Sequence, residues 1–213
     1  MSVLRIPTFL VAIAVLCGAT SLAQAQGPAP KGAKDASKSA PAAKPSAAKP
    51  PARPETAATA AAGGAEPTLI GQYGTWGAYT AMPNGRKVCF ALAKPQSSKT
   101  NPPNRPRDPA YAFVSTRPGE RVVNEVSIMI GYALKPGSES SLEVGGSSFA
   151  MYTQGDGLWI KNAAEEEQMV SAMRKSAEVT VKGVSAKGTE TTDVFSLKGL
   201  SQALDRVAQD CKR

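Results

Sequence analysis

Short apolar segments alternate with glycine- and proline-rich turns over the C-terminal two thirds of the chain. The first pair, residues 73–81 and 87–93, flanks Pro83-Asn84-Gly85. Proline presets φ and Asn-Gly tolerates positive φ, so this triplet predicts a tight hairpin turn. Further strands are predicted at 111–116, 122–132, 141–144, 147–153, 158–161, 177–185 and 191–197. Many short strands joined by glycine turns predict a mainly β domain, an antiparallel sandwich or barrel, over residues 68–213.

Two segments have helical periodicity instead. Asn162 followed by Glu165 predicts a capping box, and Arg174-Lys175 suits the carboxyl end of the helix that it opens. Met169 and Met173 are predicted to be core residues of this short internal helix. A C-terminal helix is predicted from about residue 199 to 210. Its apolar stripe recurs at helical spacing through Leu200, Ala203, Leu204, Val207, Ala208 and Cys211.

The amino terminus has the pattern of a secretory signal peptide. Arg5 precedes an apolar run at 9–19, and Ala23-Gln24-Ala25 fits a cleavage site after Ala25. The run is shorter than the ~20 residues that a membrane span needs. We therefore expect a periplasmic or secreted protein that has lost Cys17 with its signal and has no transmembrane segment.

Residues 26–67 are rich in Ala, Pro, Lys, Gly and Ser, without aromatic or branched apolar residues. Such a segment buries too little surface to offset the entropy of ordering, which predicts a disordered linker. Six cations against three acids give it a net charge of +3. It is either a solubilising tether or a contact with anionic envelope polymer, lipid headgroups or host-cell glycans. No nucleic-acid motif is present, so nucleic acid is not an expected partner.

A second basic segment, residues 94–109, contains five prolines, which exclude a central strand and predict an exposed loop. It contains four cations, Lys94, Lys99, Arg105 and Arg107, and one acid, Asp108. The loop is either a ligand-facing basic surface or an inert insertion.

Two cysteines remain once the signal is removed, Cys89 and Cys211. An oxidising compartment leaves few free thiols, so an even count predicts that they pair. The alternative is two separate buried thiols. The bridge would tie the C-terminal helix to the first hairpin.

Catalytic motifs are scarce. The chain contains no histidine, which excludes Ser-His and Cys-His nucleophile pairs and histidine metal sites. Glu165, Glu166 and Glu167 suit a solvated helix start better than a cation site. Trp159, near Lys161, is predicted to be a core residue rather than one that stacks on a sugar. We expect no enzyme, no cofactor and no metal.

Several motifs resemble the invasion-associated locus B family. They are Gly74-x-Trp76, Cys89, the turn Asp156-Gly157 before an aromatic residue, and the ending FSLKGLSQALD at 195–205. The resemblance implies an exported β-rich domain of alphaproteobacteria with no established reaction, in a family whose named member is linked to entry into host erythrocytes. The cysteines that the family usually has after the tryptophan and around the turn near Asp156 are missing here.

The sequence thus predicts an exported cell-envelope binding or structural module, involved in host-cell interaction. Two other classes stay open: a periplasmic glycan hydrolase that uses carboxylates, and a periplasmic chaperone or inhibitor domain with a protein partner.

Overall fold

The structure is a computed structural model that describes residues 54–212. Its strands are β1 (Thr68–Tyr73), β2 (Trp76–Ala81), β3 (Val88–Ala93), β4 (Ser97–Asn101), β5 (Tyr111–Arg117), β6 (Val122–Met129), β7 (Ser140–Val144), β8 (Ser147–Gln154), β9 (Gly157–Ile160), β10 (Glu178–Val184) and β11 (Glu190–Ser196). Its helices are α1 (Pro54–Ala61), α2 (Ala163–Lys175) and α3 (Leu200–Asp210), with 3-10 turns at Pro83–Gly85 and Pro118–Glu120.

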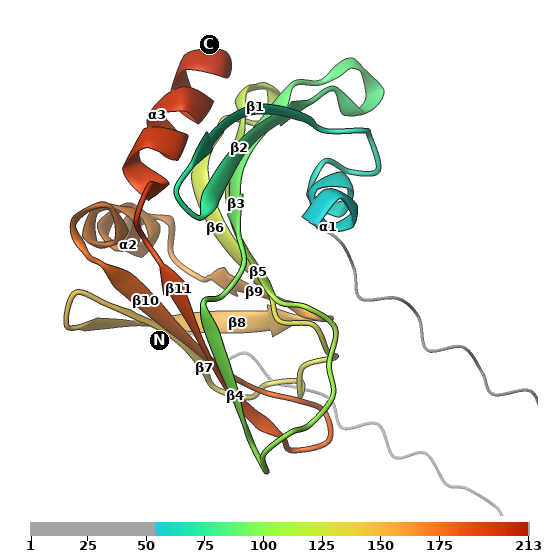
Figure 1. Cartoon of the computed structure of the whole chain (residues 1–213), viewed down its shortest axis with the longest axis vertical. Coiled ribbons are helices and arrows are strands. Elements are labelled where there is room, and N and C mark those ends of the chain that lie inside the picture. The colour runs from blue at the N-terminus through green and yellow to red at the C-terminus, as the bar shows by residue number, and fades with distance from the viewer. Residues whose placement is uncertain (1–53, 213) are drawn as a thin grey trace, which may run out of the picture. The chain divides into compact units, whose positions relative to one another are not determined.

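The strands form one antiparallel sheet in the order β1-β2-β3-β5-β6-β9-β8-β7-β10-β11-β4 (Figure 1). β3 and β4 stand eight places apart in this order, yet residues 94–96 alone join them along the chain. A flat sheet would separate the two strands by about 38 Å, whereas so short a connection spans about 14 Å. The sheet therefore bends back on itself, and the predicted mainly β, antiparallel fold class is confirmed.

The main core fills the inside of this bend. It combines residues from both halves of the sheet with the apolar stripes of α2 and α3. Met169 and Met173 of α2 are buried, as are Leu200, Leu204 and Val207 of α3. Both helices are confirmed as predicted, and α3 lies along the β1-β2-β3 end of the sheet (Figure 1).

The start of α2 has the predicted N-cap. Asn162 Oδ1 accepts from the Ala164 amide at 3.0 Å, which satisfies one of the free N–H groups of the first turn. One glutamate of the first turn is only partly solvated: Glu166 accepts a 2.7 Å hydrogen bond from the Val126 amide of β6. The helix is thereby fastened to the sheet through a half-buried carboxylate.

The first hairpin meets the beginning of α3 at two glycines. A Cβ on Gly74, where φ is +57°, would lie 2.6 Å from the Lys198 carbonyl oxygen, and one on Gly199 would lie 1.9 Å from that of Tyr73. Trp76, fully buried, donates its indole N–H to the Ser196 carbonyl at 2.9 Å. Only glycine permits this approach, which explains why the motif Gly74-x-Trp76 and the ending at 195–205 occur together.

Cys89 of β3 and Cys211 after α3 form a disulfide across 122 residues, with Cα atoms 6.0 Å apart. Both residues are buried. The predicted pairing of the two cysteines is confirmed, and it ties the end of α3 to β3.

Three expectations need correction. The predicted strand 73–81 is two strands, because Gly74 and Thr75 make the turn between β1 and β2. The predicted loop 94–109 contains β4, an edge strand that pairs with β11 and holds no proline. Edge positions tolerate the prolines on either side of it, since only one side of the strand must be bonded.

The predicted disordered linker, 26–67, is wrong over its last part. Residues 54–61 form α1, and Ala57, Ala58 and Ala62 are buried against the sheet. The composition of this segment did not predict the helix, because its alanines become buried only against apolar residues of strands elsewhere in the chain. The predicted signal peptide, 1–25, and linker residues 26–53 lie outside the described residues.

Replacing both cysteines, Cys89→Ala with Cys211→Ala, should lower the free energy of unfolding by about 2–5 kcal/mol. The bridge closes a long loop and restricts the unfolded chain. Urea unfolding measures this. Reductant should lower the free energy of unfolding of the natural protein and leave that of the double variant unchanged. If it leaves the natural protein unchanged as well, the disulfide does not contribute to stability.

Glu166→Gln should stabilise the protein at neutral pH and have little effect near pH 4. Burial raises the pKa of Glu166 and the charge of Glu125 adds to this, against the opposing Val126 hydrogen bond and Arg117. Between the ordinary and the raised pKa the folded state binds the proton more tightly than the unfolded chain, so stability falls as pH rises through that window. Glutamine keeps the acceptor for Val126 without the charge.

Melting temperatures at pH 4 and pH 7 test this, with the exposed Glu167→Gln as the control. A gain that is equal at both pH values would contradict it.

Candidate functional site

A cavity of about 600 Å³ lies between the end of β4 and the turn that joins β10 to β11. We call it the basic cavity. Its lining comes from three segments: Thr100, Pro102, Arg105, Pro106 and Arg107; Tyr132 and Ala133; and residues 185–189 with Thr191.

The β10–β11 turn is held by its own hydrogen bonds. The Ser185 amide donates to the Thr189 carbonyl at 2.8 Å, and Ser185 Oγ accepts from the Thr189 amide at 3.0 Å. Ala186 is tied to the Ala133 carbonyl at 2.9 Å. These bonds fix the backbone on which Lys187 stands exposed at the mouth of the cavity.

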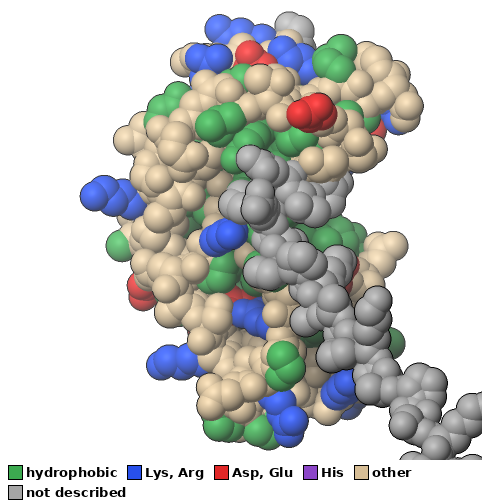
Figure 2. Space-filling view, turned by 45° about the vertical axis from the view of Figure 1, so that its right-hand side comes forward, with side chains coloured by type: hydrophobic (Ala, Val, Ile, Leu, Met, Phe, Trp, Pro, Cys, Tyr) green, Lys and Arg blue, Asp and Glu red, His purple; other side chains and the backbone are tan. Residues whose placement is uncertain are grey.

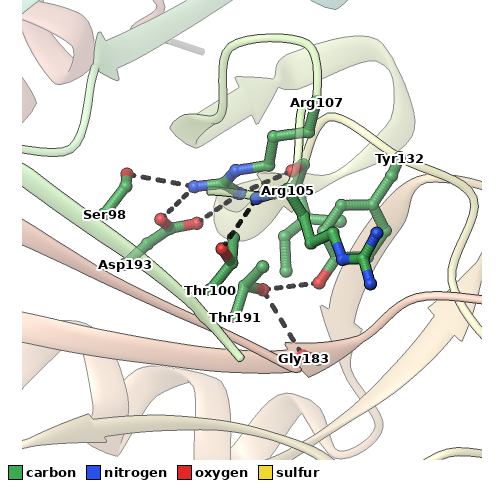
Figure 3. A network of polar contacts seen from close by, with 9 residues as sticks. Ser98, Thr100, Arg105, Arg107, Tyr132, Gly183, Thr191 and Asp193 are labelled. Atoms are coloured by element: carbon green, nitrogen blue, oxygen red, sulfur yellow. Dashed lines mark hydrogen bonds and ion pairs between the residues drawn. The ribbon is translucent and has the colours of Figure 1, made fainter. Parts of the chain in front are cut away.

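The opposite wall is the segment after β4. Thr100 Oγ1 accepts from the Arg105 amide at 3.1 Å, which folds this segment back toward the strand (Figure 3). Two residues later Arg107 turns inward. The Arg105 side chain stays exposed and lines the cavity.

Arg107 and Asp193 form a buried ion pair beneath the cavity (Figure 3). Both guanidinium Nη atoms reach the carboxylate, Nη1 to Oδ2 at 2.8 Å and Nη2 to Oδ1. Nη1 also donates to the Ile130 carbonyl at 2.7 Å and Nη2 to Ser98 Oγ at 3.0 Å. Asp193 is fully buried, and a buried charge is tolerated only with such complete pairing. The pair fastens the loop to β11 and is a structural anchor.

Tyr132 and Thr191 form the polar part of the floor. Their hydroxyl groups hydrogen-bond to each other, and Thr191 Oγ1 also donates to the Gly183 carbonyl at 3.4 Å (Figure 3). Burial raises the pKa of Tyr132 above its ordinary value, although the Thr191 hydrogen bond and the nearby Arg107 oppose this. At neutral pH the phenol therefore stays protonated, and because Thr191 donates its own proton to Gly183, the phenol donates to Thr191 Oγ1.

The electrostatic character of the basic cavity comes from Arg105 and Lys187. Asp193 neutralises Arg107, whereas neither of these two side chains has an ion-pair partner within residues 54–212. Two uncompensated cations at the mouth, above hydroxyl groups on the floor, suit an anionic ligand such as a phosphate, sulfate or carboxylate group.

The four cations predicted to form one ligand-facing surface are not brought together. Arg105 lines the basic cavity, but Lys94 lies over the Tyr111 ring, 5.6 Å from its centre. Lys99 is exposed on β4, outside the lining, and Arg107 is buried in its ion pair. Arg107 does not contribute to an exposed basic surface, because its guanidinium is needed to neutralise the buried carboxylate of Asp193. Figure 2 likewise shows Lys and Arg side chains spread over one face of the molecule without a single large patch.

Sequence reasoning missed Lys187, Tyr132, Thr191 and Asp193. One signal was available: Thr191, Asp193 and Phe195 share one side of an alternating strand, and that side is buried. A charged residue at a buried strand position requires an opposite charge nearby. The other residues become neighbours only through the fold.

Within the described part of the chain, no group of three or more His, Cys, Asp or Glu residues could hold a metal ion. A search of the same residues found no helix that combines the length and apolar character of a bilayer span.

Residues 76–208 match the family model of the invasion associated locus B (IalB) protein. The chain belongs to this family. A similar solved structure is that of invasion associated protein B from Bartonella henselae, at 17% identity and a TM-score of 0.49, with 68% of this chain and 98% of that chain covered. The comparison with curated proteins returned no match. The matched range begins at Trp76, so it includes the disulfide partner Cys89 and most of α3.

Arg107→Leu should lower the free energy of unfolding by about 3–5 kcal/mol, because it leaves the Asp193 carboxylate buried and unpaired. Arg105→Leu, the matched control two residues away, should change it by less than about 0.5 kcal/mol. The double variant Arg107→Leu with Asp193→Leu should regain most of the loss. Chemical denaturation measures all three, and equal effects of the two arginine substitutions would refute the anchoring role.

Proposed function

We propose that this member of the invasion associated locus B family is an exported, non-enzymatic binding module of the cell envelope. Its basic cavity takes an anionic group of an envelope polymer or of a host-cell surface. The periplasmic or secreted location rests on the signal-peptide pattern at residues 1–25 and on the disulfide, which is characteristic of oxidising compartments.

The pair of exposed cations, Arg105 and Lys187, carries the proposal. They stand on two different segments, each fixed by local hydrogen bonds, at the mouth of one cavity. A pre-formed arrangement loses less entropy on binding than cations on a flexible chain do. Below them the Tyr132 hydroxyl donates to Thr191 Oγ1, which donates to the Gly183 carbonyl, so both hydroxyl protons are used within the protein and the two cations supply the attraction for an anion.

The alternative of a carboxylate-dependent glycan hydrolase requires two acids that face each other in a cleft. The basic cavity has no carboxylate in its lining. Acids do line a second groove on the other face of the sheet, but Glu125 there is bound to Arg117 at 2.7 Å, and Asp108 and Asp156 are exposed in loops. A binding function therefore explains the residues better.

The double substitution Arg105→Ser with Lys187→Ser should weaken binding to immobilised heparin by about tenfold at low salt, since two exposed ion contacts are lost. The matched control, Lys161→Ser with Lys175→Ser, removes the same charge from exposed positions outside the cavity. Elution salt concentration is the measurement. Equal retention of both double variants would mean that net charge alone governs binding.

A further inference from the structure

On the first strands, the core face of the sheet carries small side chains and the outer face carries large apolar ones. On β3 and β5 the core face holds small residues, among them Ala91, Ala93 and Ala112. The outer face of the same strands holds Phe90, Leu92, Tyr111 and Phe113. A sheet with one solvated face normally places polar residues outward. This outer face therefore has the composition of an interface.

The aromatic surface continues in register across neighbouring strands. Phe113 of β5 lies opposite Ser127 of β6, which lies opposite Trp159 of β9, and Trp159 pairs with Tyr152 of β8. Directly paired residues of antiparallel strands share one face. The rings of Tyr152 and Trp159 stack with centres 5.9 Å apart. An apolar strip thus runs from β3 to β8 on the outside of the sheet.

Helix α1 covers only part of this strip. Its contact is made by the small side chains of Ala57 and Ala58, and Ala62 adds to it just after the helix ends. Beside it remains a groove of about 430 Å³, lined by alanines of α1 and by Tyr111, Phe113, Met129 and Trp159. We call it the outer-face groove. A helix of eight residues is well below the ~12–15 residues at which isolated helices become stable, so α1 depends on its contact with the sheet.

The rim of the outer-face groove is acidic at one end. Asp108 and Asp156 are exposed in its lining and, among the described residues, neither carboxylate has an ion-pair partner. At the other end Arg117 is bound to Glu125 and Glu120, each at 2.7 Å. Among the residues that line the groove the uncompensated charge is negative, opposite in sign to that of the basic cavity, although Lys94 lies outside the lining over the Tyr111 ring.

We propose that the outer-face groove, together with the sheet surface that α1 covers, is the docking site for an amphipathic helix of a partner protein, with bulky apolar residues on one face and Lys or Arg at its edge. α1 occupies part of this site in the free protein and shows that a helix fits the face. Leucine-sized side chains would fill the space that the alanines of α1 leave open, and the basic edge would meet Asp108 and Asp156.

The test uses a synthetic 14-residue helix of leucine and lysine, and a leucine–glutamate helix of the same pattern as control. Ala58→Asp removes α1 from the sheet, because Ala58 is fully buried and the introduced charge would be unpaired. This variant should bind the leucine–lysine helix about tenfold more tightly than the natural protein, in which α1 competes. Calorimetry measures the affinities.

Two further variants make the test specific. Ser127→Trp fills the groove between Phe113 and Trp159 and should abolish binding. Asp108→Lys with Asp156→Lys should reverse the preference toward the leucine–glutamate helix. Unfolding curves and the intact disulfide show that each variant is folded.

The proposal is overturned if folded Ala58→Asp binds neither helix, if both helices bind equally and Ser127→Trp has no effect, or if Ala58→Asp dimerises through the uncovered face. The last result, seen by sedimentation, would make a second copy the occupant. Arg105→Ser with Lys187→Ser should leave helix binding unchanged, so this proposal and that for the basic cavity fail independently.

Discussion

The fold depends on the contact between the first hairpin and the beginning of the C-terminal helix. Gly74 and Gly199 let two backbone segments approach closer than any side chain would permit. The indole of Trp76 bonds to Ser196 over a separation of 120 residues. At the other end of α3, the disulfide between Cys89 and Cys211 ties the helix to β3. The hairpin and the helix lie near opposite ends of the domain's sequence. The contact between them therefore forms only when the intervening strands have folded.

This closure also explains where the large side chains go. The inside of the bent sheet must accommodate α2 and α3 as well as the facing strands, so several strand positions there are alanines. The bulky residues of β3 and β5 point outward and require a cover, which α1 supplies in part. The site on that face and the basic cavity have opposite charge, so one domain presents two surfaces suited to different partners.

Much of the fold follows from local patterns. Short apolar or alternating segments placed seven strands after the first hairpin within a few residues of their observed bounds, because each has at least one buried face. Asn162 and the stripe of α3 determined both long helices through capping and amphipathic periodicity. The pairing of Cys89 with Cys211 was predictable because these are the two cysteines outside the predicted signal peptide. The family was also recognisable, because two of its motifs, Gly74-x-Trp76 and the ending at 195–205, meet in the contact between the first hairpin and the beginning of α3.

The tertiary structure decided the rest. β4 pairs only because the bend brings β11 beside it, and α1 forms only against rings contributed by distant strands. The basic cavity joins Arg105 to Lys187 across two segments that sequence leaves unrelated. Arg107 changed from a predicted ligand contact to an anchor because Asp193 is buried next to it. Local sequence determines which residues can be helical, extended or buried, but the partner of each charge and each apolar face depends on contacts between residues far apart in the chain.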